Sequence, residues 1–494
     1  MMNKARINSL ATGVPGFDAV LGGGLPEFSF NLLAGPPGSG KTTLAHQMMF
    51  ALATPERSAL YFTTLGESPL KMLRYQQQFT FFDNDQVNRS VRFISLGDDT
   101  AAGDVGSVLG RIAGEVKEYT PALVFIDSFR SVILAGEGAG ISSVNLQQFI
   151  LQLGILLASW NATTFLIGEY AGAGDSSPIF SVADGLIWLR QTTQRNSIVR
   201  KMEIVKMRGQ ATLPGLHTFR IDVEGLKVFA PTVLLAAASA PAHSLPRLHM
   251  GIPGLDQMMG GGLPRGYSLL VAGPSGSGKS ILAASFLAEG ARAAETGVIA
   301  AFEQRLHQAR APVVADLIAS GRVGVIDTRT STLSVDEIAT LLIAEIRRLG
   351  ASRVVIDSLS GFELALAPTF REDFRESLAR MLSALANTGA TVLMTSELED
   401  RYYELGFSPY GTAFLTDSII MQRYVEIDSR LERMMAVVKM RANQHSNQLR
   451  LFHIDDEGIK IDEQRGAYSG LLAGAPRRHK GRKVGRPDVI TGQR

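Results

Sequence analysis

The sequence predicts two consecutive α/β domains, each with a mostly parallel, twisted β-sheet flanked by helices. Three observations support this prediction. The 494 residues exceed the size of a single ordinary hydrophobic core. Short apolar segments alternate with longer amphipathic ones, as they do in strand–helix–strand units. Finally, residues 12–45 (TGVPGFDAVLGGGLPEFSFNLLAGPPGSGKTTLA) match residues 250–283 (MGIPGLDQMMGGGLPRGYSLLVAGPSGSGKSILA) without a gap, which indicates a duplicated domain.

The first half illustrates the expected elements. Apolar runs of this length are typical of buried strands, and they occur at FNLLAG (30–35), ALYFT (59–63), RFISL (92–96), LVFID (123–127) and TFLIG (164–168). Longer amphipathic stretches predict helices at TTLAHQMMFALA (42–53) and QQFILQLGILLASW (147–160). This alternation is typical of a parallel sheet whose strands are connected by helices.

Later motifs recur in the same order in both halves: ALVFIDS (122–128) with RVVIDS (353–358), and EIVKMRG (203–209) with AVVKMRA (436–442). We therefore expect an N-terminal domain at 1–232 and a C-terminal domain at 248–462. Residues 233–247, rich in Ala, Pro and Ser, are the expected linker. Residues 463–494 form a basic tail that we expect to be disordered. The tail could bind nucleic acid or an acidic partner, or serve only as a solvated end.

Composition excludes several kinds of site. The chain has no cysteine, which rules out disulfides, thiolate zinc sites and a cysteine nucleophile, and is compatible with a reducing cytoplasm. The eight histidines show no metal-ligand spacing. The N-terminus lacks the apolar core of a signal peptide, and no run approaches the roughly 18 apolar residues of a membrane helix. We therefore expect a cytoplasmic protein that does not enter a membrane.

The strongest motif is G-x-x-x-x-G-K-[ST], present as GPPGSGKT (35–42) and GPSGSGKS (273–280). Its glycines let backbone N–H groups approach a phosphate, its lysine reaches the β- and γ-phosphates, and its hydroxyl residue faces Mg²⁺. The following helix directs its positive N-terminus at the same anion. The predicted nucleotide-binding residues are Gly35, Gly38, Ser39, Gly40, Lys41, Thr42 and Thr43 in the first half, and Gly273, Gly276, Ser277, Gly278, Lys279, Ser280 and Ile281 in the second.

A second acidic position accompanies each of these loops. Asp127 and Asp357 each end an apolar run, which places a carboxylate at the carboxyl edge of the sheet. Such a carboxylate can hold a water of Mg²⁺, so we predict that Asp127 with Thr42, and Asp357 with Ser280, bind the metal. The guanine-specific N-K-x-D motif is absent from the sequence, and ATP is therefore the expected nucleotide.

These motifs resemble the KaiC family, the double RecA-like ATPases of the cyanobacterial clock. The resemblance rests on the tandem arrangement, the GxPGxDxxxGGGLP lead-in to each phosphate loop and the KMR triplet late in each half, and it extends to about Asp462. It implies two RecA-like domains per chain and a homohexameric double ring with ATP between neighbours. It also implies that the KMR cations reach the γ-phosphate held by the adjacent subunit, where they would stabilise the transition state. These cations are Lys206, Arg208, Lys439 and Arg441, which Arg200 and Arg433 would assist.

The halves differ where the family has two consecutive glutamates, one of which serves as general base. The first half has Gly66 and Glu67 there, and the second has Glu303 and Gln304. If the first position carries the base, the C-terminal site hydrolyses ATP and the N-terminal site mainly holds it. If Glu67 can replace the missing residue, both sites are slow enzymes. Both glutamates could instead simply end their strands.

The family's autophosphorylation sites are also altered. The paired acceptor positions are Ala413 and Phe414, neither of which can carry a phosphate. Thr412, Ser408 and Thr416 are nearby hydroxyls, so Ser/Thr autokinase activity in the C-terminal domain stays open, whereas a phosphorylation cycle on the paired sites is not expected.

Three functions are therefore compatible with the sequence. The favoured one is a KaiC-like ring ATPase with a signalling or regulatory role and an unidentified regulatory protein partner. A RecA-class ATPase that depends on nucleic acid is less favoured, because the body of the chain is mildly acidic and shows no basic stripe. The third is a scaffold that holds two nucleotides without hydrolysing them.

Overall fold

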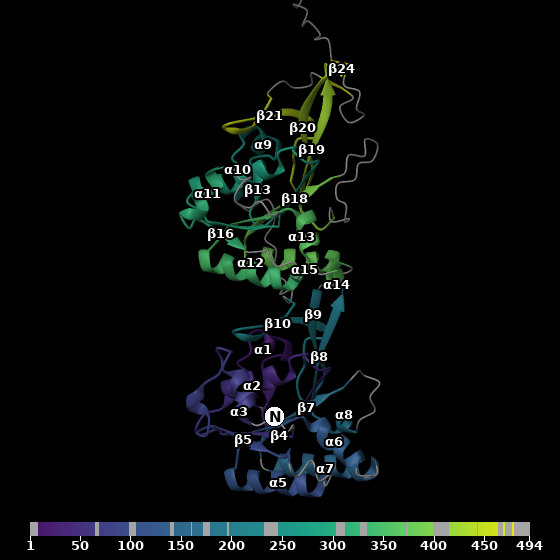
Figure 1. Cartoon of the computed structure of the whole chain (residues 1–494). Coiled ribbons are helices and arrows are strands. Elements are labelled where there is room, and N and C mark those ends of the chain that lie inside the picture. The colour runs from purple at the N-terminus through teal and green to yellow at the C-terminus, as the bar shows by residue number, and fades with distance from the viewer. Residues whose placement is uncertain are drawn as a thin grey trace, which may run out of the picture. The chain divides into compact units, whose positions relative to one another are not determined.

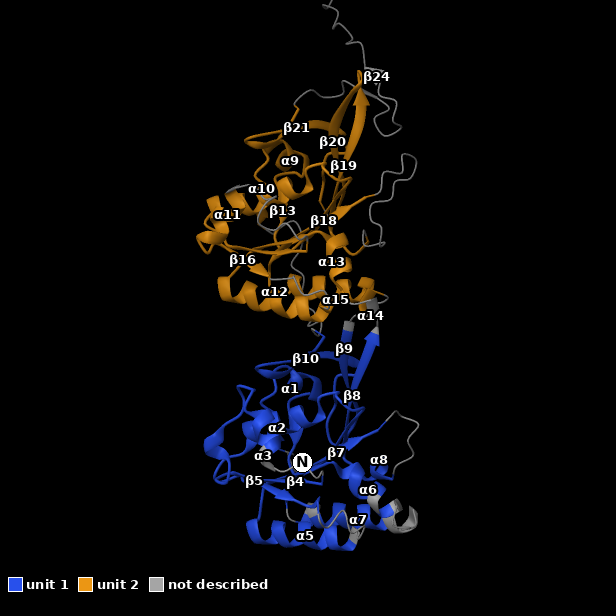
Figure 2. Cartoon of the chain, in the orientation of Figure 1, with its two compact units in different colours: residues 1–231 blue, residues 232–494 orange. Residues whose placement is uncertain are grey.

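The computed structural model describes residues 8–64, 69–97, 105–138, 143–159, 161–170, 178–194, 197–231, 246–302, 312–326, 333–366, 368–371, 374–398, 414–441, 443–462, 468–469 and 477–478. The chain divides into two compact units, Met1–Pro231 and Thr232–Arg494, here called unit 1 and unit 2 (Figure 2). Each unit is described by itself.

Unit 1 contains a two-stranded ribbon and a nine-stranded sheet with helices (Figure 1). Its helices are α1 (Phe17–Leu21), α2 (Lys41–Leu52), α3 (Pro69–Gln76), η1 (Asn84–Gln86), α5 (Val105–Tyr119), α6 (Phe129–Gly138), α7 (Ser143–Ser159) and α8 (Ile179–Val182). Its strands are β1 (Ser9–Leu10), β2 (Leu25–Pro26), β3 (Phe30–Gly35), β4 (Ala59–Thr63), β5 (Val91–Ser95), β6 (Leu123–Asp127), β7 (Thr163–Glu169), β8 (Gly185–Gln194), β9 (Ser197–Met207), β10 (Leu216–Asp222) and β11 (Gly225–Phe229).

Unit 2 repeats this arrangement. Its helices are α9 (Pro253–Met258), α10 (Lys279–Arg292), α11 (Pro312–Ala319), α12 (Val335–Leu349), α13 (Leu359–Ala365), α14 (Pro368–Arg371) and α15 (Phe374–Ala386). Its strands are β12 (Arg247–Leu248), β13 (Leu263–Pro264), β14 (Ser268–Gly273), β15 (Gly297–Ala301), β16 (Val323–Ile326), β17 (Arg353–Asp357), β18 (Thr391–Glu397), β19 (Ser418–Ile427), β20 (Arg430–Met440), β21 (Arg450–Asp455), β22 (Gly458–Ile461), β23 (Tyr468–Ser469) and β24 (Arg477–Arg478).

The two large sheets have the same strand order. In unit 1 it is β11-β10-β9-β8-β3-β7-β6-β4-β5, and in unit 2, starting from the equivalent edge, it is β22-β21-β20-β19-β14-β18-β17-β15-β16. The strands from β8 to β5, and from β19 to β16, pair in parallel, whereas the remaining strands pair antiparallel. The predicted fold class, two tandem α/β domains of RecA-like type with mostly parallel sheets, is thereby confirmed.

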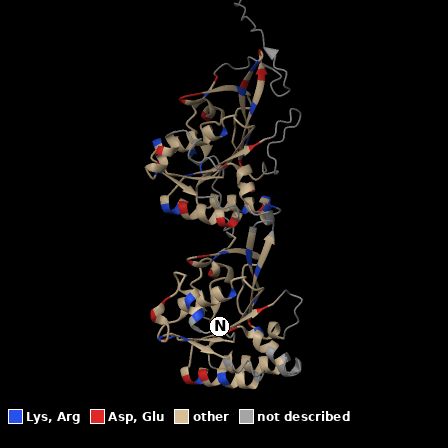
Figure 3. Cartoon of the chain, in the orientation of Figure 1, with Lys and Arg blue, Asp and Glu red and all other residues tan. Residues whose placement is uncertain are grey.

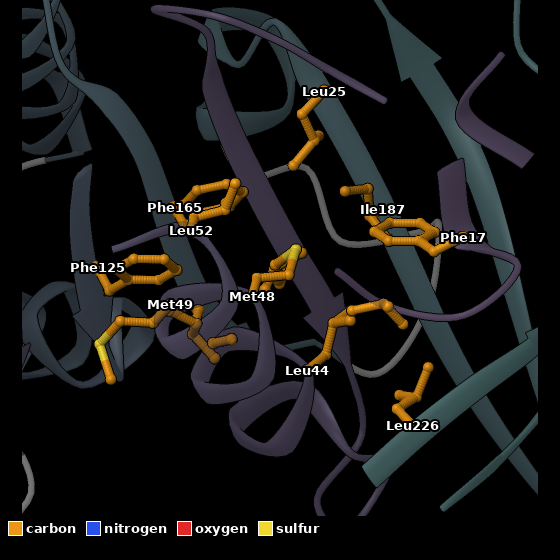
Figure 4. Packing of buried hydrophobic residues seen from close by; sticks show 14 of the residues in the cluster. Phe17, Leu25, Leu44, Met48, Met49, Leu52, Phe125, Phe165, Ile187 and Leu226 are labelled. Atoms are coloured by element: carbon orange, nitrogen blue, oxygen red, sulfur yellow. The ribbon is translucent and has the colours of Figure 1, made fainter. Parts of the chain in front are cut away.

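Helices cover both faces of the sheet in unit 1. Alternate residues along each strand point to opposite faces, so Leu33 packs with α1 and α2, while Leu32 packs with α5, α6 and α7. Figure 4 shows the first of these cores, in which Leu44 and Met48 of α2 lie beneath the sheet among aromatic side chains of neighbouring strands. This packing places the N-terminus of α2 directly after the loop that follows β3.

The core of unit 2 follows the same plan. Val271 of β14 packs with α9 and α10 on one face, and Leu270 packs with α12, α13 and α15 on the other. A capping box at the start of α12, in which the Ser334 side chain accepts from the Glu337 backbone and the Glu337 side chain accepts from the Ser334 backbone, marks one helix boundary.

The strands expected in the first half are all present within a residue of their predicted bounds, and the helix expected at 147–160 is the second part of α7. In the segment predicted as linker, only Pro246 and Arg247 are described, and β12 begins at the latter. In the segment predicted as a basic tail, only β23 and β24 are described, and they pair antiparallel. The domain boundaries and the disorder of the tail stay predictions.

Charged residues of both signs are interspersed along the outer helices of each unit (Figure 3). On α5, Arg111 and Glu115 form an ion pair at 2.9 Å, and on α12 Glu345 binds Arg348 through two hydrogen bonds. Among the helices that the structure describes, none is long and apolar enough to cross a membrane.

Candidate nucleotide-binding sites

The loop of unit 1 between β3 and α2 has the backbone that the phosphate-binding motif predicts. Gly38 and Gly40 have φ values of +73° and +100°, in the left-handed region that favours glycine. A Cβ atom on Gly40 would lie 2.5 Å from Cδ1 of Ile221. Gly40 is also the N-cap of α2, and no side chain caps the helix there. The first N–H groups of α2 are therefore left for an anion.

Two polar side chains of this loop have hydrogen-bonding capacity that a phosphate group could use. The Nζ of Lys41 donates to the carbonyl of Pro36 at 2.9 Å, so the cation lies over the loop. Burial lowers the pKa of Lys41, while the nearby carboxylates of Glu169 and Asp127 oppose this. The hydroxyl of Ser39 is buried and has no hydrogen-bond partner in the described part of the chain. Phosphate oxygens would satisfy both groups, so these residues fit a nucleotide triphosphate.

Asp127 lies beside the same helix terminus, as predicted. Its Oδ2 accepts hydrogen bonds from the hydroxyl of Thr42 at 2.8 Å and from the hydroxyl of Tyr61 at 2.7 Å. Burial raises the pKa of Asp127, and these two hydrogen bonds and Lys41 oppose the rise. The described residues contain no group of three or more His, Asp or Glu side chains arranged to hold a metal ion. The hydroxyl and carboxylate of this pair nevertheless fit Mg²⁺, which usually binds through one or two protein oxygens together with phosphate and water.

The loop of unit 2 has nearly the same geometry. Gly276 and Gly278 have φ values of +74° and +104°, and a Cβ on Gly278 would lie 2.7 Å from Cδ1 of Ile454. The Nζ of Lys279 donates to the carbonyls of Gly273 and Pro274 at 2.9 and 2.8 Å. No side chain caps the N-terminus of α10. This loop therefore also fits a nucleotide.

The remaining predicted loop residues occupy the first turns of the helices. Thr43 is partly exposed, Ser280 is exposed, and Ile281 is partly buried against the core of unit 2. The hydroxyl of Ser277, unlike that of Ser39, donates to Oε1 of Gln422 at 3.1 Å. Asp357 accepts a hydrogen bond from Thr395 of β18.

Tyr61 and Thr395 were not predicted as partners of the aspartates. Each is a fully buried hydroxyl residue within a strand, ALYFT or TVLMTSE, that also contains other hydroxyl residues. Such a residue is a signal, because a buried hydroxyl needs a hydrogen-bond partner. Which partner it finds depends on strand order, which a local pattern does not specify.

The KMR cations lie at the opposite edge of the sheet from the loop of their own unit. At the start of β8, Gly185 pairs with Asn31 of β3 and with Met207 of β9. Asn31 is near the amino end of β3, whereas the phosphate loop follows its carboxyl end. Lys206 and Arg208, which flank Met207, are therefore far from the glycines of their own loop.

The side chains of these cations contact groups that precede β8 and β19. Lys206 donates to the carbonyls of Ser181 and Ala183 at 3.2 and 2.5 Å, and Arg208 binds Asp184 at 3.1 Å. In unit 2 the pattern recurs. Lys439 donates to the carbonyl of Thr416 at 2.5 Å, and Arg441 binds Asp417 at 3.3 Å and the carbonyl of Phe414 at 2.9 Å.

Arg200 and Arg433 occupy the other end of the same hairpins. Arg433 pairs with Tyr424, whose hydroxyl donates to the carbonyl of Ser275 in the phosphate loop at 3.4 Å. Arg200 pairs with Gln191. Each arginine precedes its KMR lysine by six positions along the strand, which corresponds to about 20 Å. Within one unit the predicted arginine and lysine therefore cannot meet at one phosphate group.

The predicted general bases, Glu303 and Glu67, lie outside the described residues. The backbone bonds that precede them give a register. Thr64 donates to the carbonyl of Asp127 at 2.9 Å, and Phe302 donates to that of Asp357 at 3.0 Å. Thr64 is thus the residue of unit 1 that corresponds to Phe302. The assignment of Glu303 or Glu67 as general base stays a prediction.

Of the residues considered for autophosphorylation, Ala413, Thr412 and Ser408 also lie outside the described residues. Phe414 is half-exposed, and the guanidinium of Arg375 lies 4.3 Å from the centroid of its ring. Thr416 is fully buried, so its hydroxyl is a poor target for phosphorylation in the folded chain.

Comparisons with known proteins place the chain in a family. Residues 10–233 and 248–466 each match the family described as the KaiC ATPase. The circadian clock oscillator protein KaiC of Prochlorococcus marinus is 26% identical over 489 residues, covering 96% of this chain and 96% of that protein. KaiC 1 of Synechocystis sp. is 26% identical over 485 residues, covering 96% of this chain and 92% of that protein. The motifs, the duplicated sheet and these two matches agree, and the chain belongs to the KaiC family of ATPases.

Proposed function

We propose that the chain is a ring-forming ATPase that binds Mg·ATP at both phosphate loops and that each site is completed by Lys and Arg side chains of a neighbouring subunit. The observation that carries this proposal is the position of the KMR cations at the opposite edge of the sheet from their own phosphate loop. The proposal gives these cations a role that they cannot have within one unit.

The geometry of unit 1 supports contacts between subunits. Lys206 pairs with Leu186, which lies near the start of β8 and several residues before β8 reaches the phosphate loop. The Nζ of Lys206 donates to a carbonyl of the segment that precedes β8. Arg208 is more than half exposed. The phosphate loop and the KMR cations lie at opposite edges of the sheet. A contact between the loop of one copy and the cations of the next copy is therefore a head-to-tail contact. Such contacts close into rings when the rotation between copies allows it.

Charge explains why the contact would depend on nucleotide. The cations bind carbonyl oxygens and the partly exposed carboxylates of Asp184 and Asp417, and burial lowers the pKa of Lys206 and Lys439. A triphosphate from a neighbour offers oxygens of higher charge, and charge-assisted hydrogen bonds to phosphate are the stronger ones. Cations supplied in this way stabilise charge that develops during phosphoryl transfer.

Magnesium would be held in unit 1 by Thr42 and Asp127, and in unit 2 by Ser280 and Asp357. When bound, the ion neutralises charge on the β- and γ-phosphates. The chain's own contribution is to hold these oxygens at the carboxyl edge of the sheet, beside the lysine of each loop.

We propose further that the two sites have different tasks. Glu303 is the second residue after β15 in the sequence and can act as general base towards water, whereas Gly66 takes its place in the first half. On this basis unit 2 hydrolyses ATP, and unit 1 mainly holds it between subunits. A slow reaction that uses Glu67 is the alternative for unit 1.

The biological role proposed is signalling or regulation through a protein partner. The named relatives are clock oscillator proteins, and a nucleotide-dependent ring is suited to change its surface with each turnover. Autophosphorylation on Ser or Thr in unit 2 is the second activity proposed, on a residue other than Ala413 or Phe414, neither of which has a hydroxyl. The interspersed charges on α5 and α12 (Figure 3) favour this role over nucleic-acid binding, which a one-sign surface would support.

The test combines size and chemistry. Purified chain is incubated with Mg²⁺ and ATP labelled at the γ-phosphate, passed over a sizing column, and analysed for label in free phosphate and in protein. We expect an oligomer that releases labelled phosphate. A Lys279→Met variant should lose most of its phosphate release. A Lys41→Met variant should lose the ability to assemble more than the ability to hydrolyse ATP.

Three results would contradict the proposal. A particle that stays monomeric with Mg·ATP but hydrolyses it at the full rate would exclude completion between subunits. An assembled particle that releases no phosphate would indicate a scaffold. Stimulation of hydrolysis by single-stranded or duplex DNA would favour the nucleic-acid-dependent ATPase.

A further inference from the structure

Hydroxyl groups from opposite neighbouring strands hold the two aspartates at the ends of β6 and β17. β6 lies between β4 and β7, and β17 lies between β15 and β18. In unit 1 the hydroxyl comes from Tyr61 on β4, on one side of the aspartate. In unit 2 it comes from Thr395 on β18, on the other side.

The register shows that the two arrangements are alternatives. Ala59 pairs with Leu123, and Gly297 with Arg353, so Tyr61 corresponds to Ile299. Glu169 pairs with Gly35, and Glu397 with Gly273, so Thr395 corresponds to Ile167. Each unit thus has a hydroxyl at one of the two positions and isoleucine at the other.

We propose that Tyr61 in unit 1 and Thr395 in unit 2 are positioning residues, each of which orients one aspartate to bind the magnesium of its own nucleotide. This inference rests on the proposed function, because it assumes that Mg·ATP occupies both loops. Neither residue has been assigned a role by its sequence motif, since both lie inside strands rather than in the phosphate loop.

The geometry in unit 1 explains why a second hydroxyl is needed. Asp127 is 7% exposed, so water does little to fix its orientation. Its two hydrogen bonds come from Thr42 and Tyr61, and both reach the same oxygen, Oδ2. Thr42 is itself one of the residues that would hold Mg²⁺, so its hydroxyl would then no longer orient the carboxylate. The hydroxyl of Tyr61 would be left to orient Asp127.

The ring of Tyr61 is itself held in place. It stacks on His46 of α2 with centroids 4.5 Å apart and on Phe125 of β6 with centroids 6.0 Å apart. Tyr61 is fully buried, so its hydroxyl is fixed before any ligand binds. Ligands that are fixed in this way by their hydrogen-bond partners typically bind a metal about 10- to 100-fold more tightly than ligands that have lost the partner.

The experiment counts metal sites in the full-length chain. Mn²⁺ prefers the same octahedral oxygen ligands as Mg²⁺, and free Mn²⁺ is measured by electron paramagnetic resonance during a titration in the presence of a non-hydrolysable ATP analogue. The parent should bind two Mn²⁺ per chain. In Tyr61→Phe one of the two should weaken about 10- to 100-fold, and in Thr395→Val the other should, so that the double variant weakens both.

A second readout separates positioning from damage to the fold. Affinity for the analogue in EDTA, where no metal is present, should equal that of the parent in both variants. Tyr119→Phe removes a phenol hydroxyl from α5, outside the site, and should leave both metal sites unchanged. Adding Ile167→Thr to Tyr61→Phe recreates in unit 1 the arrangement of unit 2, and should restore the weakened site.

The outcomes are distinguishable. Two tight Mn²⁺ sites in Tyr61→Phe would overturn the inference while leaving the proposed function intact. Equal loss of affinity with and without metal would also overturn it, because that result means a general disturbance of the loop. A parent chain that binds no Mn²⁺ together with the analogue would overturn the proposed function and the inference together.

Discussion

His46 predicts a loss of stability in unit 1 at mildly acidic pH. It lies in α2, fully buried, with its ring stacked on Tyr61 and 6.0 Å from the centroid of Phe93. Neither ring nitrogen makes a hydrogen bond of normal geometry within the described residues, although the Gln76 side chain lies close to the ring. Burial lowers the pKa of His46 from 6.5 to about 3, and the neighbouring Gln76 side chain opposes this only in part. The ring is therefore neutral in the folded unit.

The direction of this pH effect follows from the pKa of His46 in the folded and unfolded states. The unfolded chain takes up a proton on His46 below a pKa of about 6.5, whereas the folded unit does so only near 3. The contribution to stability is therefore complete above about pH 6.5 and is lost progressively as the pH falls towards 3. At pH 5.5, one unit below the unfolded pKa, the loss is about 1.4 kcal/mol relative to pH 7.5.

The assay compares the parent with His46→Phe, which keeps an aromatic ring for stacking but cannot take up a proton. Hydrogen exchange of amides in β3 and β6 gives the free energy of opening of unit 1 at pH 7.5 and 5.5, without assuming that the whole chain unfolds in one step. The parent should lose about 1.4 kcal/mol more than the variant between these values. Equal losses in the parent and in His46→Phe would refute the reasoning.

Two further predictions concern the sites directly. In Gly40→Ala the alanine must adopt a left-handed backbone, and its Cβ lies against Ile221. Unit 1 should therefore lose about 2–4 kcal/mol of stability, measured by the same hydrogen exchange. It should also lose its nucleotide. If the variant bound as much nucleotide as the parent, a phosphate loop that requires glycine at position 40 would be excluded. Glu303→Gln should reduce ATP turnover about 100-fold or more, and Glu67→Gln should leave it near the parental rate in a phosphate-release assay; the reverse order would assign hydrolysis to unit 1.

The fold was predictable because the duplicated sequence repeats its motifs in a fixed order. A phosphate loop, an aspartate at a strand end and a late KMR triplet occur in both halves. Identical order in the chain gives identical strand order in the two sheets. The contact between Thr42 and Asp127 was predictable for the same reason, since a parallel sheet brings the carboxyl ends of its strands to one edge.

Contacts that depend on which strands are neighbours were not predictable. Nothing local in ALYFT shows that β4 borders β6, so the bond from Tyr61 to Asp127 could not be foreseen. The location of Lys206 depends on the antiparallel return of β9, which carries the KMR triplet to the amino end of β3. The spacing between Lys206 and Arg200 was visible in the sequence. The direction in which the hairpin of β8 and β9 runs relative to the phosphate loop was not.

Mixing two inactive variants tests the central claim most directly. Lys279→Met damages the phosphate loop of unit 2 but leaves Arg441 intact, and Arg441→Ala does the opposite. Arg441 is more than half exposed, so its loss should cost the fold less than about 1 kcal/mol.

If each nucleotide is completed by a neighbour, a mixture assembled with ATP contains contacts in which an intact loop meets an intact arginine. About one contact in four should then be active in an equal mixture, and ATP turnover should rise far above the turnover of either variant alone. A mixture that hydrolyses ATP at no more than the average rate of the two separate variants would contradict the claim.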